Sequence, residues 1–154
     1  MHIERSRRRV RAVRVVATAV LCAALSVALA SAPTNARANE RGDYLAKLAL
    51  VLDGLRRTLI WVEMNPTNHE LARFAHGLSE AYVQMAGRMT PPGELRMVHP
   101  HLVIVAENTE RAIAAAAEED VRTMRSRART VREELRTLEG ILEHLRMRLP
   151  QIPR

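Results

Sequence analysis

Apolar residues recur along the last third of the chain at alternating steps of three and four. The ladder consists of Val121, Met124, Ala128, Val131, Leu135, Leu138, Leu142, Leu145 and Leu149. Residues at this spacing stay on one face of a helix. The pattern therefore predicts a long helix over 120–149 that packs lengthwise against other helices.

The same spacing predicts three earlier helices, over 42–64, 67–89 and 91–118. Their expected inner faces are Leu45, Leu48, Leu52, Leu55, Leu59 and Val62 in the first, Leu71, Phe74, Leu78, Tyr82 and Met85 in the second, and Leu95, Val98, Leu102, Val105, Ala112 and Ala116 in the third. Trp61 is interpreted as a packing residue at the end of the first helix, with ligand stacking as the alternative.

Pro residues and caps set the ends of these helices. Asn65-Pro66 ends the first, because Pro lacks a backbone donor and restricts the residue before it. The second begins at Thr67, where Thr67 and Glu70 have capping-box spacing. The third opens at Pro91-Pro92, and Pro100 is expected to kink it or to delay its regular start.

No Gly or Pro separates the third helix from the fourth, so a single helix over 91–149 is the alternative to two. Such a helix would be roughly 90 Å long, far longer than its partners. The ladder also changes phase between Ala116 and Val121. We therefore predict a break over 118–120. Four helices of similar length with short connections indicate an all-α fold, an up-down-up-down four-helix bundle.

The first 38 residues have the features of an export signal. Six arginines begin it, residues 15–32 are uncharged and rich in Ala, Val and Leu, and Ala36-Arg37-Ala38 has cleavage spacing. We predict cleavage after Ala38, with the bundle in 39–154 and a periplasmic or extracellular location. The alternative is an uncleaved anchor, in which 15–32 spans the inner membrane and the bundle lies outside the cytoplasm.

The basic character of the chain belongs mainly to this signal. The full chain has 24 Lys and Arg against 17 Asp and Glu, whereas residues 39–154 have 17 against 16. A charge this close to zero removes the electrostatic support for a nucleic-acid partner. The single cysteine, Cys22, also lies in the signal, so the mature domain has no thiol for a disulfide or a metal site.

One short element resembles a known group of proteins. Pro91, Pro92, Leu95, His99 and Leu102 follow the pattern Pro-Pro-x-x-Leu-x-x-x-His-x-x-Leu. This pattern is similar to one in small exported bacterial helical-bundle proteins and lipoproteins, where a long helix, a short acidic or Gly-Asp turn and a last helix follow. The resemblance implies a helical bundle without an assigned activity, and it carries over no catalytic residue.

Histidines are the candidate ligands for a metal or a haem. His69, His76 and Glu80 share a stripe of the second helix, on the side opposite Leu71 and Leu78, and could hold a divalent cation on the surface. The alternative is an ordinary solvated stripe.

His99 lies on or beside an inner face. It is interpreted as a semi-buried histidine that forms a hydrogen bond across the bundle, or as a ligand with His101 if Pro100 distorts the backbone. A haem held by His144 and a methionine is a further alternative.

Known catalytic and cofactor motifs are missing from the chain. It contains no Gly-rich phosphate loop, no Gly-x-Ser-x-Gly elbow, no zinc-protease motif and no Glu-x-x-His pair. We therefore predict a protein that is not an enzyme and has no cofactor.

Arginines form a stripe beside the apolar ladder of the last helix, and they are a candidate contact for an anionic surface. The stripe is Arg125, Arg129, Arg132 and Arg136. Its ordinary interpretation is ion pairing with Glu107, Glu110 or Glu118. Its functional interpretation is contact with lipid headgroups or an acidic partner.

The leading hypothesis is a structural or protein-binding module of the cell envelope. The alternatives are a periplasmic metal- or haem-binding bundle and a membrane-anchored bundle. Partner identity and oligomeric state are not predicted.

Overall fold

The described part of the protein is entirely helical. The computed structural model describes residues 32–152, in which four α-helices and one 3₁₀ turn occur and no strand does. The elements are α2 (Ala32–Met64), α3 (His69–Arg88), η1 (Gly93–Leu95), α4 (His99–Ala117) and α5 (Val121–His144). The prediction of an all-α fold is therefore confirmed. Residues 1–31, which hold most of the predicted signal and its apolar span, lie outside the described residues.

The α2 helix crosses the boundary between two compact units, residues 1–39 and 40–154. The described part of the first unit, residues 32–39, is helical and includes the predicted cleavage site. Among the described residues, no helix combines the length and the apolar character needed to cross a membrane.

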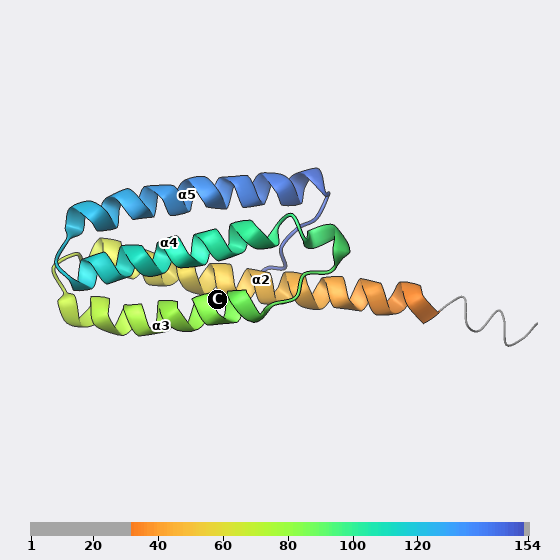
Figure 1. Ribbon diagram of the computed structural model, residues 1–154, viewed down its shortest axis with the longest axis horizontal. Helices are drawn as coiled ribbons and strands as arrows, with labels where there is room; N and C mark the ends of the chain where they lie inside the picture. Colours follow the sequence, from red (N-terminus) through yellow and green to blue (C-terminus); the bar gives the residue numbers. More distant parts are fainter. Residues whose placement is uncertain (1–31, 153–154) are drawn as a thin grey trace, which may run out of the picture. The chain divides into compact units, whose positions relative to one another are not determined.

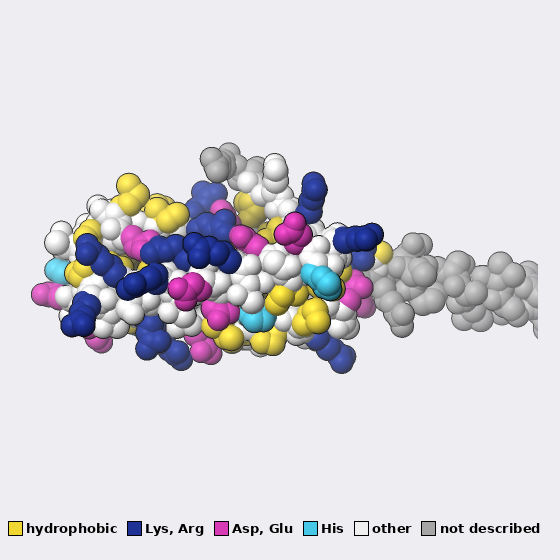
Figure 2. Space-filling view, turned by 90° about the horizontal axis from the view of Figure 1, so that it is seen from above, with side chains coloured by type: hydrophobic (Ala, Val, Ile, Leu, Met, Phe, Trp, Pro, Cys, Tyr) yellow, Lys and Arg dark blue, Asp and Glu magenta, His cyan; other side chains and the backbone are white. Residues whose placement is uncertain are grey.

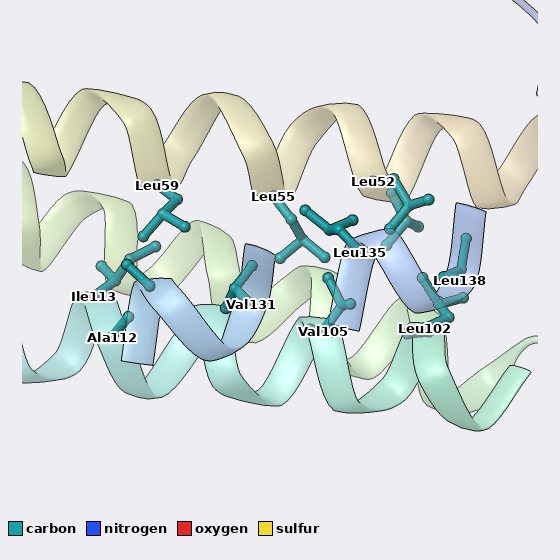
Figure 3. Close-up of a cluster of buried hydrophobic side chains, with 14 of the residues drawn as sticks. Leu52, Leu55, Leu59, Leu102, Val105, Ala112, Ile113, Val131, Leu135 and Leu138 are labelled. Carbon is teal, nitrogen blue, oxygen red and sulfur yellow. The ribbon is translucent and has the colours of Figure 1, made fainter. Parts of the chain in front are cut away.

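Within residues 40–152 the four helices lie side by side around one aliphatic core (Figure 1). The ladder of α5 is buried from Met124 to Leu142, and the expected inner positions of α2 are buried from Leu48 to Val62. All six expected positions of the third predicted helix are buried as well. Figure 3 shows side chains from α2, α4 and α5 meeting in this core. The periodicity of these three segments therefore identified their buried faces.

The predicted inner face of α3 is correct at Tyr82, which packs against the core, but wrong at Phe74 and Met85. Phe74 and Met85 are 63% and 41% exposed. The buried positions of α3 are instead occupied by small residues: Ala72, Ala75, Ser79 and Ala86. These residues also recur at helical spacing, and a face without bulky side chains lets neighbouring helices pack closely against it. The larger apolar residues are consequently turned toward the surface or its edge.

The starts of α3 and α4 also differ from the expected positions. The α3 helix begins at His69, and its cap is Asn68, whose side chain accepts a hydrogen bond from the Leu71 N–H at 3.0 Å. The α4 helix begins at His99, with Pro100 in its first turn, where the missing N–H is harmless. Pro100 therefore delays the regular helix rather than kinking it, and η1 occupies the preceding stretch.

The chain breaks between α4 and α5 where the ladder changes phase. The Ala115 carbonyl accepts from the Asp120 N–H at 2.8 Å, and the Ala116 carbonyl accepts from the Glu119 N–H at 3.2 Å. Glu119 has φ 68°. This left-handed residue and the paired hydrogen bonds form a Schellman motif. Asp120 then caps α5 by accepting from the Thr123 N–H at 2.9 Å.

The α5 helix ends at His144, five residues before the predicted end. Arg146 has φ 55°, and the Met147 N–H donates to the Leu142 carbonyl at 2.8 Å, which is a second Schellman motif. The chain then returns beside α2 (Figure 1), where Leu149 and Ile152 line a surface groove together with Leu52. Leu149, the last residue of the ladder, therefore packs from the irregular segment after the turn and not from a helix.

Candidate functional site

A glycine of α2 faces an aromatic ring of α3. A Cβ placed on Gly54 would collide with the ring and hydroxyl of Tyr82. Because α2 and α3 are joined by the short connection 65–68, they run antiparallel, and this contact fixes their register. Trp61 is seven residues after Gly54, and Ala75 is seven residues before Tyr82. Trp61 is consequently level with Ala75 and its neighbour Phe74.

Four large apolar side chains gather along this contact and remain exposed. Leu50 and Trp61 of α2 are 51% and 48% exposed, alongside Phe74 and Met85 of α3. Leu50 and Trp61 lie four residues before and seven after Gly54, which places them on the same side of α2. We call these four residues the α2–α3 apolar face. Contiguous exposed apolar side chains of this kind typically mark an interaction site.

One end of the α2–α3 apolar face opens into a groove of about 740 Å³. Its lining residues are Tyr44, Lys47, Leu50, Ala81, Gln84, Met85, Arg88, Met89 and Thr90. Among the described residues that line it, Lys47 and Arg88 carry charge, and both are cations. The groove thus combines an apolar surface with positive charge.

The sequence contains features that point to the α2–α3 apolar face, although the spacing of the large apolar residues alone did not reveal it. Trp61 was interpreted as a packing residue, yet almost half of its surface is exposed. Gly54 has no side chain, and the small residues of α3 recur at helical spacing. Both features are typical of helices that pack closely. A small stripe that competes with a large one on the same helix indicates that the large residues are available for another partner.

His99 joins α4 to α2 through Tyr44. The Tyr44 hydroxyl lies 3.0 Å from His99 Nδ1, and the two rings meet edge to face at a centroid distance of 6.2 Å. Burial raises the pKa of Tyr44 to about 12 and lowers the pKa of His99. The hydroxyl therefore keeps its proton and the imidazole is neutral, and a hydrogen bond joins the hydroxyl and Nδ1.

The candidate metal residues of α3 have different surroundings from one another. His76 Nε2 donates to Glu110 Oε1 of α4 at 2.6 Å, whereas His69 Nε2 lies 3.7 Å from Glu119 Oε1. Glu80 is exposed. Within residues 32–152, no three His, Cys, Asp or Glu side chains form a group that could hold a metal ion. His69 and His76 therefore contact different carboxylates, those of Glu119 and Glu110.

The other candidate histidines also lie apart. His101 Nδ1 donates to Glu134 Oε2 of α5 at 3.1 Å, while His99 faces α2. The structure therefore does not bring His99 and His101 together, because the helix is regular beyond Pro100. His144 is exposed at the last residue of α5.

Arg132, one residue of the arginine stripe of α5, has a partner other than those expected. Arg132 Nη1 donates to Glu63 Oε1 of α2 at 2.9 Å. Glu107 and Glu110, two of the predicted partners, pair with Arg111 and His76. Figure 2 shows Lys and Arg side chains gathered over the face that α5 provides, with Asp and Glu side chains between them.

Comparison of the chain with protein-family models, curated proteins and solved structures finds no match.

Proposed function

We propose that residues 39–154 form an up-down-up-down four-helix bundle that acts as a non-enzymatic, protein-binding module of the bacterial cell envelope. The observation that carries this proposal is the α2–α3 apolar face. Phe74 and Met85 are exposed although small residues occupy the buried side of the same helix. A helix needs only its buried stripe for folding, so its second apolar stripe is available for binding.

The partner that suits this face is an amphipathic helix with acidic residues beside its apolar stripe. Its apolar residues would cover Trp61 and Phe74 and enter the groove at Met85, and its carboxylates would lie near Lys47 and Arg88. Burial of one large apolar side chain contributes about 1.5–3 kcal/mol. The cations would mainly steer association and fix the orientation of the partner.

A pair of matched double variants tests this function in the full-length protein. Phe74→Ser with Met85→Ser removes apolar surface from the α2–α3 apolar face, whereas Met97→Ser with Ile104→Ser removes exposed apolar side chains outside it. Both pairs are exposed, so each substitution should change stability little.

We expect the first variant to lose an envelope protein that the wild type and the second variant retain after crosslinking and affinity purification. Equal retention by both variants would contradict the proposal. Retention that weakens with salt would identify the contribution of Lys47 and Arg88.

We also propose that the chain reaches the envelope through the predicted signal, residues 1–38. Support comes from its arginine-rich start, its apolar segment and the small residues that follow. The layout is similar to that of small exported helical-bundle proteins. Amino-terminal sequencing of the exported protein should give Asn39 as the first residue. A membrane-bound chain that keeps residues 15–32 would favour the anchored alternative.

A further inference from the structure

The side of α3 opposite its buried stripe carries a second stripe, whose two halves complement each other. We call it the outer stripe of α3. Its residues are all exposed and are Glu70, Phe74, Gly77, Ala81, Met85 and Arg88. Their steps of three and four keep them on one side of the helix, away from the buried small residues. The α3 helix can therefore pack on its own bundle and still offer a face to a second helix.

The two ends of the outer stripe carry opposite charges. Glu70 lies in the first turn of α3, and Arg88 is its last residue. If two copies of α3 pack antiparallel about a two-fold axis at the level of residue 79, Glu70 of each copy lies opposite Arg88 of the other. Lys47 of α2 lines the groove together with Arg88, so each carboxylate meets two cations. A two-fold interface forms every contact twice, and this charge complementarity is therefore doubled.

The same arrangement brings an aromatic ring to the groove of the α2–α3 apolar face. Residue 74 of one copy lies opposite residue 84 of the other, where Leu50 and Met85 line the groove of about 740 Å³. Leu50 and Met85 are 51% and 41% exposed, so the groove offers accessible apolar surface to the ring. Phe74 is itself 63% exposed. Each ring would consequently be covered by the groove of the other copy.

Small residues occupy the centre of the outer stripe, where the two copies of α3 meet. In the antiparallel pair Gly77 lies opposite Ala81. No atom lies within 4 Å of a Cβ built on Gly77, so packing in the described part of the chain does not require glycine there. Glycine inside a helix is less favourable than alanine. At a helix crossing, however, a missing side chain lets the two axes approach closely, which would account for this glycine.

We propose that two copies of this chain form a dimer in which the outer stripes of α3 pack antiparallel about a two-fold axis. The proposal rests on the proposed function, because it names the protein that covers the α2–α3 apolar face. The α3 helix of a second copy has the properties required of that partner, since Glu70 lies beside its exposed apolar residues. A two-fold interface uses the same surface on both copies, so the assembly closes at two.

Charge reversal at the ends of the outer stripe tests this pairing. Sedimentation of the full-length protein over a range of concentrations should show a monomer–dimer equilibrium. Glu70→Arg and Arg88→Glu should each raise the dissociation constant at least tenfold, because each change brings like charges together twice. Glu80→Arg, at an exposed position of α3 outside the outer stripe, is the control and should leave the constant unchanged.

Two further samples test whether the ends pair with each other. In an equimolar mixture of Glu70→Arg and Arg88→Glu, both ion pairs of a mixed dimer join opposite charges, so dimers should form again. The double variant Glu70→Arg with Arg88→Glu keeps the net charge of the wild type and should also dimerise.

A substitution at the centre tests the close approach without altering charge. Gly77→Leu should abolish the dimer, because the leucine would hold the two helices apart. Gly140→Leu, at a helical glycine of α5 that also has no atom within 4 Å of a Cβ, should retain it. Thermal unfolding of each variant checks that it is folded.

A wild type that stays monomeric at all concentrations would overturn the proposal. Association that Glu70→Arg, Arg88→Glu and Gly77→Leu leave unchanged would overturn it as well, as would a failure of the mixture to form dimers. These results are distinct from a failure of the proposed function. A monomeric protein that captures another envelope protein through Phe74 and Met85 would leave the proposed function intact.

Discussion

At the scale of single residues, the contact between Tyr44 and His99 links the packing of α2 and α4 to the protonation state of His99. The hydroxyl and Nδ1 are 3.0 Å apart, and burial keeps the hydroxyl protonated and the imidazole neutral. Protonation of His99 leaves Nδ1–H able to donate to the hydroxyl oxygen, but it places a charge in a partly buried site.

This contact predicts a loss of stability on acidification. Because burial lowers the pKa of His99 below its ordinary value of 6.5, the unfolded chain binds the proton more tightly than the folded chain. The contribution of His99 to the free energy of unfolding is present above pH 6.5. It is lost as the pH falls from there toward the lower pKa of the folded state.

Urea unfolding at pH 7.5 and pH 5 measures this effect. The decrease in the free energy of unfolding should be smaller in His99→Gln than in the wild type. His144→Gln, at an exposed histidine, is the control and should behave as the wild type does. Identical decreases in His99→Gln and the wild type would show that His99 does not couple stability to pH.

At the scale of the helical elements, the α2–α3 contact depends on a position without a side chain. Gly54→Ala places a methyl group against the Tyr82 ring, and such overpacking typically costs about 1–3 kcal/mol. Gly140→Ala is the matched control, because no atom lies within 4 Å of a Cβ there. Alanine at this helical position should stabilise the protein by about 0.5–1 kcal/mol.

Opposite signs of these two changes, measured by urea unfolding, would support the close contact. In a Tyr82→Ala background the penalty of Gly54→Ala should disappear. A stabilising effect of Gly54→Ala in the wild type would mean that α2 and α3 do not pack at this point.

The helices differ in how far their sequence predicted their packing. In α5 the apolar residues form one stripe, so spacing alone identified Met124, Val131 and Leu138 as buried. In α3 a stripe of small residues and a stripe of large apolar residues have the same helical period. Periodicity alone therefore does not show which of the two stripes is buried. Which stripe is buried depends on contacts with other helices, and such contacts join residues far apart in the sequence, as Gly54 and Tyr82 are.

The site residues were harder to predict than the helices. Ion pairs such as Arg132 with Glu63 join residues 69 positions apart, and their selection depends on which helix faces which. The spacing of His69, His76 and Glu80 shows that they share one side of their own helix. It gives no information about side chains on the neighbouring helices. The carboxylates that pair with the two histidines come from the α4 helix and from the turn after it.

At the scale of the whole bundle, the two sides of α2 have different properties. On the α3 side, large apolar residues are exposed beside Lys47 and Arg88. On the α5 side, two ion pairs join α2 to α5 above buried aliphatic side chains. The first surface suits a helical protein partner. Both surfaces follow from how the neighbouring helices pack against α2.

The measurement that tests the central claim most directly is site-specific photocrosslinking in cells, with a photoreactive phenylalanine analogue at position 74. The control is the same analogue at position 104, an exposed apolar site of α4 outside the α2–α3 apolar face. We predict a discrete crosslinked protein for position 74 that is absent for position 104. The absence of any crosslink at position 74, or the same product from both positions, would contradict the claim.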